Sequence, residues 1–347
     1  MAVRKRKSRK KKETGAALIF LTVFLLVLSA SAAAAGWAIF APFGPGAETF
    51  VEVAPGSSTA RIGQQLEAAG VVRSRYGFDL VRWWKRGTLR AGEYRFDHPA
   101  TIAEVYARIV RGDVYTRTVT IPEGANLFDV AARLEQAGFG PRQEFLAAAA
   151  AQTGLVADLD PGAKSLEGYL FPDTYHLARK ATAQQICATM VRRFRAVAGQ
   201  LGLNRNVRAV VTKASLVERE TAVDAERPLV ASVFGNRLEK GMPLMTDPAV
   251  IYGLELEGRW RGVIYKSDLA RDTAYNTYLH KGLPPGPIAN PGQRSLRAAM
   301  EPARTDYLYF VAAGSDPQGH SVFSSSLDEH NHNVAGYRQS VKKAGGR

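Results

Sequence analysis

The sequence predicts an α+β protein with one N-terminal membrane helix, a small strand-helix region and a larger, mostly helical domain with some strands. Three observations predict this arrangement. An uncharged apolar run lies near the N-terminus, short β-like stretches then alternate with amphipathic helical patterns, and helical patterns dominate from Gln143 onward. The 347 residues therefore divide into a basic tail (1–15), a membrane helix (16–41), a strand-helix region (47–117) and a second domain (118–345).

The basic tail accounts for half of the net charge of +14, since residues 1–13 contain eight Lys or Arg and a single Glu. A net charge this high is typical of nucleic-acid binding when it is spread over a domain. Here it directly precedes an apolar segment, which indicates a cytoplasmic flank under the positive-inside rule. We therefore expect no nucleic-acid partner.

The apolar run from Ala16 to Ala41 has 26 uncharged residues, more than the roughly 20 that span a bilayer as a helix. A cleavable signal peptide is the alternative, because Ala30-Ser31-Ala32 resembles a small-residue cleavage site. The run continues through Trp37 and Phe40, which favours an uncleaved single-pass anchor in the inner membrane. Either alternative places the rest of the chain on the outer, periplasmic side. The single cysteine, Cys187, permits no intramolecular disulfide and is expected in the core.

Two segments of the sequence resemble each other without gaps, residues 56–70 and residues 124–138. Each follows a short β-like stretch and predicts a turn, an amphipathic helix and a glycine stop. A third helix behind a turn is expected at 101–110. Such strand-helix units resemble the LysM modules that bind glycan chains, although units of this kind are common and many bind nothing.

Longer helices are expected in the second domain at 145–151, 183–201, 207–221 and 228–240. Residues 275–291 are dense in Gly and Pro and predict an irregular loop. Residues 307–312 predict a buried strand. A long loop inside a compact domain is usually functional.

Two carboxylates, Glu218 and Glu220, end the helix predicted at 207–221. A carboxyl group beside packed aliphatic residues stays protonated more easily, as a general acid must. Helix geometry places Glu218 on the apolar stripe and Glu220 roughly 110° from its centre. Glu218 is therefore expected to be the more buried. A structural ion pair is the alternative role for these residues, because Lys213, Arg219 and Arg227 lie nearby.

Several motifs resemble the MltG/YceG-like family of endolytic peptidoglycan transglycosylases. Ala214-Ser-Leu-Val-Glu-Arg-Glu-Thr-Ala222 carries the resemblance most clearly. Further matching motifs follow in the same order as in the family, at 166–175, 233–238, 246–252, 275–278, 282–288, 290–292, 307–311 and 323–331. The resemblance covers essentially the whole chain after the anchor. It implies a LysM-like region before a lysozyme-like catalytic domain.

In that family the catalytic acid is the second glutamate of Glu-x-Glu-Thr, which implies Glu220, with Glu218 as the reserve. The implied reaction breaks the bond between MurNAc and GlcNAc within glycan strands and leaves 1,6-anhydroMurNAc ends. Expected sugar contacts are Tyr252, Tyr275, Asn276, Tyr278 and Asp247, although each tyrosine is equally well explained by packing. Met245 departs from the family, which often has glutamine there, so a donated hydrogen bond to sugar at this position is in doubt.

No metal site is expected, because His320, His330 and His332 lack a His-Glu-x-x-His pattern and a nearby cysteine. No cofactor is expected either, since dinucleotide and P-loop fingerprints are missing from the sequence. The expected partners are peptidoglycan glycan strands and the membrane, with peptidoglycan synthases as candidate protein partners. The rival function is a glycan-binding scaffold of the cell-wall machinery in which the glutamates are only structural.

Overall fold

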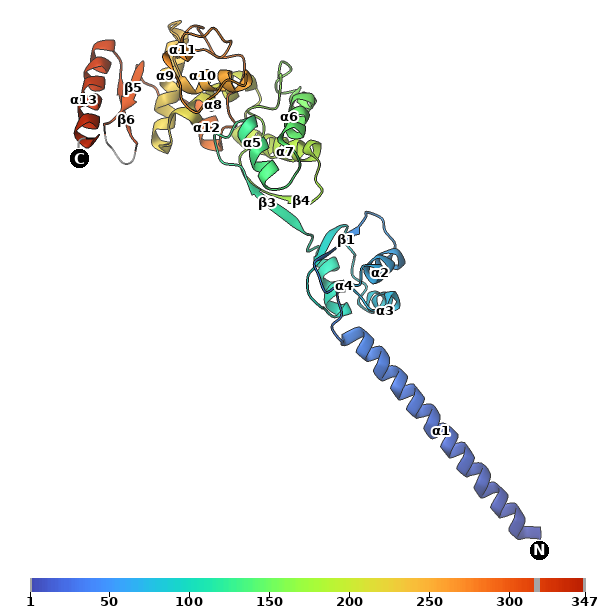
Figure 1. Cartoon of the computed structure of the whole chain (residues 1–347). Helices are drawn as coiled ribbons and strands as arrows, with labels where there is room; N and C mark the ends of the chain where they lie inside the picture. Colours follow the sequence, from blue (N-terminus) through green and yellow to red (C-terminus); the bar gives the residue numbers. More distant parts are fainter. Residues whose placement is uncertain (1, 315–318, 346–347) are drawn as a thin grey trace. The chain divides into compact units, whose positions relative to one another are not determined.

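A computed structural model describes residues 2–314 and 319–345 of the chain. The chain separates into two compact units, Met1–Thr116 and Arg117–Arg347. Among the described residues there are three two-stranded sheets, formed by β1 with β2, β3 with β4 and β5 with β6. The fold therefore combines many helices with small sheets, and the prediction of mixed helix and sheet is confirmed at that level (Figure 1).

The first unit begins with one long helix, α1 (Ala2–Phe40). Its segment Leu18–Phe40 is 23 residues long with a mean hydropathy of 2.5, which is long and apolar enough to cross a membrane. The large apolar side chains from Leu18 to Leu28 are all more than half exposed, and they have no protein partner to bury them. A helix of this kind is compatible with a membrane anchor and also with a signal sequence.

The rest of the first unit folds around one apolar core. Strands β1 (Thr49–Val53) and β2 (Gly92–Phe96) pair antiparallel, with Val51 opposite Tyr94. Helices α2 (Thr59–Ala68), α3 (Arg75–Lys85) and α4 (Ile102–Arg111) complete the unit. The core residues Leu66, Phe78, Tyr94 and Ile109 are fully buried among these elements. Packing of these faces, and not helix propensity, supplies most of the stability of such short helices.

The two similar segments of the sequence adopt the same local structure. In residues 56–70, Ser58 caps α2 and the helix is followed by Gly70 at φ +67°. In residues 124–138, Asn126 caps α5 (Leu127–Gln136) and the helix is followed by Gly138 at φ +78°. Glycine adopts this left-handed conformation without steric cost, which explains both glycine stops. The predicted turn, helix and stop are confirmed in both copies.

The second unit is mainly helical. After β3 (Thr116–Thr120) and α5, its elements in chain order are α6 (Arg142–Ala151), η1 (Thr153–Val156), β4 (Thr174–Ala178), α7 (Ala183–Leu201), α8 (Val207–Glu220), η2 (Asp224–Glu226), α9 (Arg227–Glu239), α10 (Asp247–Leu256), α11 (Lys266–Leu269), α12 (Gln293–Met300), β5 (Tyr309–Ala312), β6 (Ser321–Ser324) and α13 (Leu327–Gly345). The helices expected from the sequence at α6 to α9 are confirmed. The buried strand expected at 307–312 is shorter, and its residues are only partly buried. Residues 275–291 form no helix or strand, as predicted.

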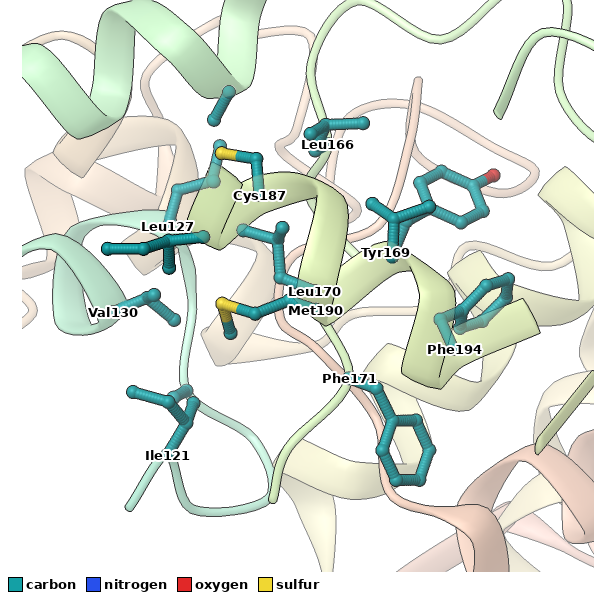
Figure 2. Packing of buried hydrophobic residues seen from close by; sticks show 14 of the residues in the cluster. Ile121, Leu127, Val130, Leu166, Tyr169, Leu170, Phe171, Cys187, Met190 and Phe194 are labelled. Carbon is teal, nitrogen blue, oxygen red and sulfur yellow. The ribbon is translucent and has the colours of Figure 1, made fainter. Parts of the chain in front are cut away.

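The main core of the second unit surrounds α7 (Figure 2). Leu127 and Val130 of α5 face Cys187 and Met190 of α7, while Phe194 lies edge-on to Tyr169 with ring centroids 5.2 Å apart. Cys187 is fully buried, which confirms its expected place in the core. This core holds the N-terminal half of α8 in a fixed position.

A second apolar cluster holds the C-terminal half of α8. Leu216 and Val217 of α8 pack with Phe234 of α9 and Ala249 of α10, and all four are fully buried. Figure 1 shows α8, α9, α10 and α12 gathered in this part of the unit. The last turn of α8, which carries both candidate carboxylates, is therefore fixed by packing on several sides.

Candidate active site

The last turn of α8 ends at Glu220 because Thr221 leaves the helix, with an extended backbone at φ −138°. The Thr221 hydroxyl donates to Glu226 Oε2 at 3.3 Å and accepts from the Val223 amide at 3.0 Å. Glu226 in turn accepts from the Ser321 amide of β6 at 2.6 Å. Thr221 and Glu226 are both buried. This chain of hydrogen bonds fixes the direction in which Glu220 leaves the helix.

Glu218 is a buried structural ion pair. Its Oε1 accepts from Arg227 Nη1 at 2.7 Å, and its Oε2 accepts from the Gly292 amide at 2.8 Å. The side chains of Glu218 and Arg227 are only 4% and 6% exposed. Arg227 also donates to Ser295 Oγ at 2.6 Å. Glu218 thus joins α8, α9 and α12, and the role of a structural ion pair is confirmed for it. Glu220 is also largely withdrawn from water, so burial alone does not separate the two carboxyl groups.

Glu220 has a different environment, although it lies only two residues away. Burial raises the pKa of its carboxyl group to about 7, and the negative charge of Asp247 acts in the same direction. The positive charges of Arg237 and Arg219 oppose that rise in pKa. A carboxyl group with this pKa is partly protonated at neutral pH and can both donate and accept a proton there.

Asp247 and Tyr278 form a hydrogen-bonded pair near Glu220. The Tyr278 hydroxyl donates to Asp247 Oδ1 at 2.6 Å. Asp247 is the first residue of α10, and Tyr278 lies in the irregular segment 275–291. Burial raises the pKa of Tyr278, followed by its hydrogen bond to Asp247 and by the charges of Asp247 and Glu220. The structure therefore brings together Glu220, Asp247 and Tyr278.

Arg237 also belongs to this site, although the sequence did not single it out. Its Nε donates to the Leu308 carbonyl and its Nη1 to the Leu244 carbonyl, both at 2.7 Å. Its guanidinium lies 5.4 Å from the ring centre of Tyr309. Burial lowers the pKa of Arg237, while the charges of its neighbours, including Glu220, raise it. The sequence signal for Arg237 is a basic residue within the motif at 233–238, inside a helix pattern that is largely apolar.

Tyr252 and Asn276 support the site from within the core. Tyr252 is 3% exposed, and its ring lies edge-on to Tyr275 at 5.0 Å. Asn276 is fully buried, where its Nδ2 donates to the carbonyls of Leu269 and Arg271 and its Oδ1 accepts from the Tyr278 amide. Asn276 thus orients Tyr278. In this conformation the buried side chains of Tyr252 and Asn276 offer no surface to a ligand, whereas Tyr275 is partly exposed.

Glu167 is a further buried carboxyl group that the sequence did not identify. It accepts from the Leu127 amide at 2.9 Å and from Asn290 Nδ2 at 3.2 Å. Burial raises its pKa to about 8, although hydrogen bonds from the Leu127 amide, Tyr252 and the Gly168 amide oppose the rise. Asn290 also donates to the Ala125 carbonyl at 2.9 Å. The network joins the start of α5 to the irregular segment.

A polar groove of about 710 Å³ lies on the Glu218 side of the unit. Its lining residues are Glu123, Asp224, Arg227, Pro228, Gln293, Arg294, Arg297, Ala298 and Glu301. Burial raises the pKa of Glu123, and the nearby charge of Glu218 adds to that effect. Both acidic and basic side chains line this groove, and Glu220 is not among them. The groove is therefore separate from the cluster around Glu220.

Comparison with known proteins agrees with the motifs. The model of the YceG-like family matches residues 51–336. An endolytic murein transglycosylase of Bacillus subtilis is 32% identical over 302 residues, covering 81% of this chain and 82% of that protein. One from Streptococcus pneumoniae strain R6 is 31% identical over 323 residues, covering 82% of this chain and 57% of that protein.

A solved structure agrees as well. The crystal structure of a YceG-like protein from Listeria monocytogenes is similar with a TM-score of 0.54 and 31% identity, covering 82% of this chain and 98% of that chain. The resemblance inferred from the sequence motifs is confirmed. Because the family model spans most of the chain and relatives above 30% identity align over four fifths of it, this chain belongs to the YceG-like family.

Proposed function

We propose that this protein is an endolytic murein transglycosylase, the name carried by its Bacillus and Streptococcus relatives. The observation that carries the proposal is the environment of Glu220, whose carboxyl pKa is raised to about 7 by burial. Such a group can protonate a glycosidic oxygen at neutral pH. Glu218 does not compete for this role, because its carboxylate is engaged by Arg227 and the Gly292 amide.

The proposed reaction uses one acid twice. Protonated Glu220 donates its proton to the oxygen between MurNAc and GlcNAc, and that bond breaks with assistance from the substrate N-acetyl group. The MurNAc 6-hydroxyl then attacks its own anomeric carbon, and Glu220 takes up the hydroxyl proton. The products are a GlcNAc hydroxyl and a 1,6-anhydroMurNAc end. Intramolecular attack has a high effective concentration, so no group is needed to activate water.

The neighbours of Glu220 have separate proposed roles. The negative charge of Asp247 favours the protonated form of Glu220 before the first step. The positive charge of Arg237 stabilises the Glu220 carboxylate that this step produces. Tyr278 and Asp247 are the proposed sugar contacts nearest the acid, and Tyr275 is a further candidate contact. Tyr252 and Asn276 hold this arrangement in place.

The remaining parts of the chain fit a wall enzyme tethered at its substrate. We propose domain limits of 47–117 for a LysM-like region that binds glycan and 118–345 for a lysozyme-like catalytic domain. Residues 1–15 form the cytoplasmic tail and 16–41 an uncleaved anchor in the inner membrane. The apolar helix Leu18–Phe40 supports this placement by its length and composition. Peptidoglycan synthases are the proposed protein partners.

The mechanism is tested by the origin of the oxygen atom on the anomeric carbon of the new MurNAc end. Peptidoglycan sacculi are digested by the full chain in ¹⁸O-labelled water, and the muropeptides are analysed by mass spectrometry. We expect 1,6-anhydroMurNAc ends that lack the label, because the oxygen comes from the sugar itself. Labelled reducing ends would indicate hydrolysis, with Asp247 as the first candidate for a second catalytic carboxylate. If the folded chain leaves intact sacculi that a control enzyme digests, the protein is a glycan-binding scaffold.

A further inference from the structure

Helix α3 of the first unit has two apolar faces. Phe78 and Val81 point into the core and are 0% and 4% exposed. The other face carries Tyr76, Leu80, Trp83 and Trp84, which are 68%, 49%, 70% and 72% exposed. Their spacing of four, three and one residues puts these four side chains on one side of a helix. Exposed tryptophans side by side on one helix face mark a surface that meets an apolar partner.

The exposed face of α3 adjoins the end of the membrane-spanning helix. Ile39 and Phe40, the last two residues of α1, line one apolar pocket of about 290 Å³ together with Leu80, Val81, Trp83 and Trp84. Polar atoms contribute almost nothing to this surface. A Cβ added at Gly77 of α3 would lie 4.0 Å from Ile39, so the two helices approach closely.

A cation–π contact gives a second link between α1 and the region around α3. The Arg73 guanidinium lies 3.5 Å from the ring centre of Trp37 in α1 and 5.1 Å from that of Phe43. A backbone pairing between Phe43 and Ala100 follows directly after α1. The first unit therefore holds the end of α1 through side-chain and main-chain contacts, and α3 stays beside it.

The length of the apolar segment places this junction at the membrane surface. Leu18–Phe40 comprises 23 residues, which extend roughly 35 Å as a helix and match a hydrocarbon core about 30 Å thick. Phe40 then lies at the outer boundary of that core. Because Phe40 shares a pocket with Leu80 and Trp84, the exposed face of α3 lies at the same depth.

The charges around α3 suit that position. Residues 73–90 contain six Lys or Arg and one Asp. Tryptophan and tyrosine concentrate where bilayer hydrocarbon meets the headgroups, and arginine or lysine beside them binds anionic lipid phosphate. We infer that Tyr76, Leu80, Trp83 and Trp84 form a membrane-docking face that enters the outer leaflet of the bilayer in which α1 is anchored.

This inference rests on the proposed membrane anchor and adds a second point of attachment to it. An anchor alone leaves α1, and the first unit with it, free to tilt in the bilayer and to rotate about the helix axis. With α3 docked, the unit has one fixed orientation at the lipid surface. Lipid thus becomes a structural partner of a region otherwise assigned to glycan.

Tryptophan fluorescence tests the docking face in the full chain. The chain has four tryptophans, and Trp37→Phe with Trp260→Phe leaves only Trp83 and Trp84 as reporters. The variant is reconstituted into phosphatidylethanolamine–phosphatidylglycerol vesicles with lipids brominated either near the headgroup or deep in the acyl chain. We expect the shallow bromines to quench about twofold more strongly than the deep ones, and aqueous acrylamide to quench weakly.

Two controls separate the docking face from the anchor. A chain that keeps only Trp37 reports on insertion of α1 in the same vesicles. Leu80→Asp puts a charge into the docking face and is expected to reduce bromine quenching of Trp83 and Trp84, whereas Thr88→Asp adds the same charge beyond α3 and is expected to leave it unchanged.

The outcomes distinguish the two proposals. If lipid quenches Trp37 while acrylamide alone quenches Trp83 and Trp84, the anchor stands and the docking face is overturned. If lipid quenches none of the three, the anchor itself fails, and the docking inference fails with it. If Trp83 and Trp84 are shielded from both quenchers, protein covers the face, as a second copy of the chain would, and lipid docking is overturned.

Discussion

Glu218 and Glu220 lie two residues apart at the end of α8 and have opposite environments. The Glu218 carboxylate is bound by Arg227 at 2.7 Å and by the Gly292 amide at 2.8 Å. Burial and the negative charge of Asp247 both oppose ionisation of the Glu220 carboxyl group. One helix turn thus presents a carboxylate held in an ion pair and a carboxyl group of raised pKa, which is the proposed acid. Replacing each of them should have different effects.

Replacing the acid should abolish most activity and preserve the fold. Glu220→Gln keeps the shape of the side chain but removes its transferable proton, so we expect the rate of strand cleavage to fall by roughly 10²–10⁴. Release of anhydro-muropeptides from sacculi measures this rate. Glu239→Gln, on the exposed end of α9, is the matched control and should retain full activity. Cleavage at the normal rate by Glu220→Gln would assign the acid to another residue.

The same variant should be more stable than the parent at alkaline pH. The folded-state pKa of Glu220, about 7, lies above its ordinary value of 4.5. Ionisation therefore costs folded-state stability, with no penalty below the ordinary pKa and the full penalty above pH 7. We expect Glu220→Gln to gain on the order of 1–3 kcal/mol over the parent at pH 8 and little at pH 4. Urea unfolding at both pH values provides the measurement, and equal differences at both would refute a raised pKa.

Removing Glu218 should mainly reduce stability. Glu218→Ala leaves Arg227 buried without its main partner, which costs about 3–5 kcal/mol. Chemical denaturation of the variant measures this loss. Activity per folded molecule should change far less than in Glu220→Gln, and this comparison identifies which carboxylate is the acid. Glu257→Ala, an exposed glutamate after α10, serves as the control and should cost under about 1 kcal/mol.

Asp247 should set part of the pH dependence of cleavage. The proposed reaction needs protonated Glu220, so kcat/KM is expected to fall as the pH rises through about 7. Asp247→Asn removes a negative charge that raises the Glu220 pKa. The pH at which kcat/KM falls should therefore become lower. Tyr278→Phe keeps that charge and removes only the hydrogen bond to Asp247, so it should shift the pH of this fall in kcat/KM less. If kcat/KM falls at the same pH in Asp247→Asn as in the parent, burial alone sets the pKa of Glu220.

The N-terminal segment should remain attached in the mature protein. Intact-mass measurement of the membrane-extracted chain is expected to include the basic tail, because the apolar run continues past Ala32 to Phe40. A mature form that starts near Ala33 would identify a cleaved signal sequence. Protease added outside spheroplasts should remove residues after the anchor and spare the tail, if the N-terminus faces the cytoplasm.

The sequence predicted those parts of the fold that local patterns determine. Apolar spacing located α7 and α8, and helix phase placed Glu218 in the core. Helix α3 was missed, although its side chains have clear helical periodicity and Ser74 caps its first turn. The surroundings of Glu220 depend on a long irregular segment and on α10, and no local pattern encodes how these meet. The sequence motif was therefore needed to choose between the two glutamates. Tertiary packing decides which of the predicted sugar contacts reach the surface: Asp247, Tyr275 and Tyr278 do, whereas Tyr252 and Asn276 are buried.

The ending of α8 at Glu220 has a consequence for the electrostatics of the backbone. The peptide dipoles of a helix align, and the carbonyl oxygens of its last turn carry the negative end of the combined dipole. A carboxylate at that end is repelled by the main chain itself, whatever side chains surround it. The course of the chain at Thr221 therefore adds to the proton affinity of Glu220, and extending the helix by one further turn would move the acid away from that field.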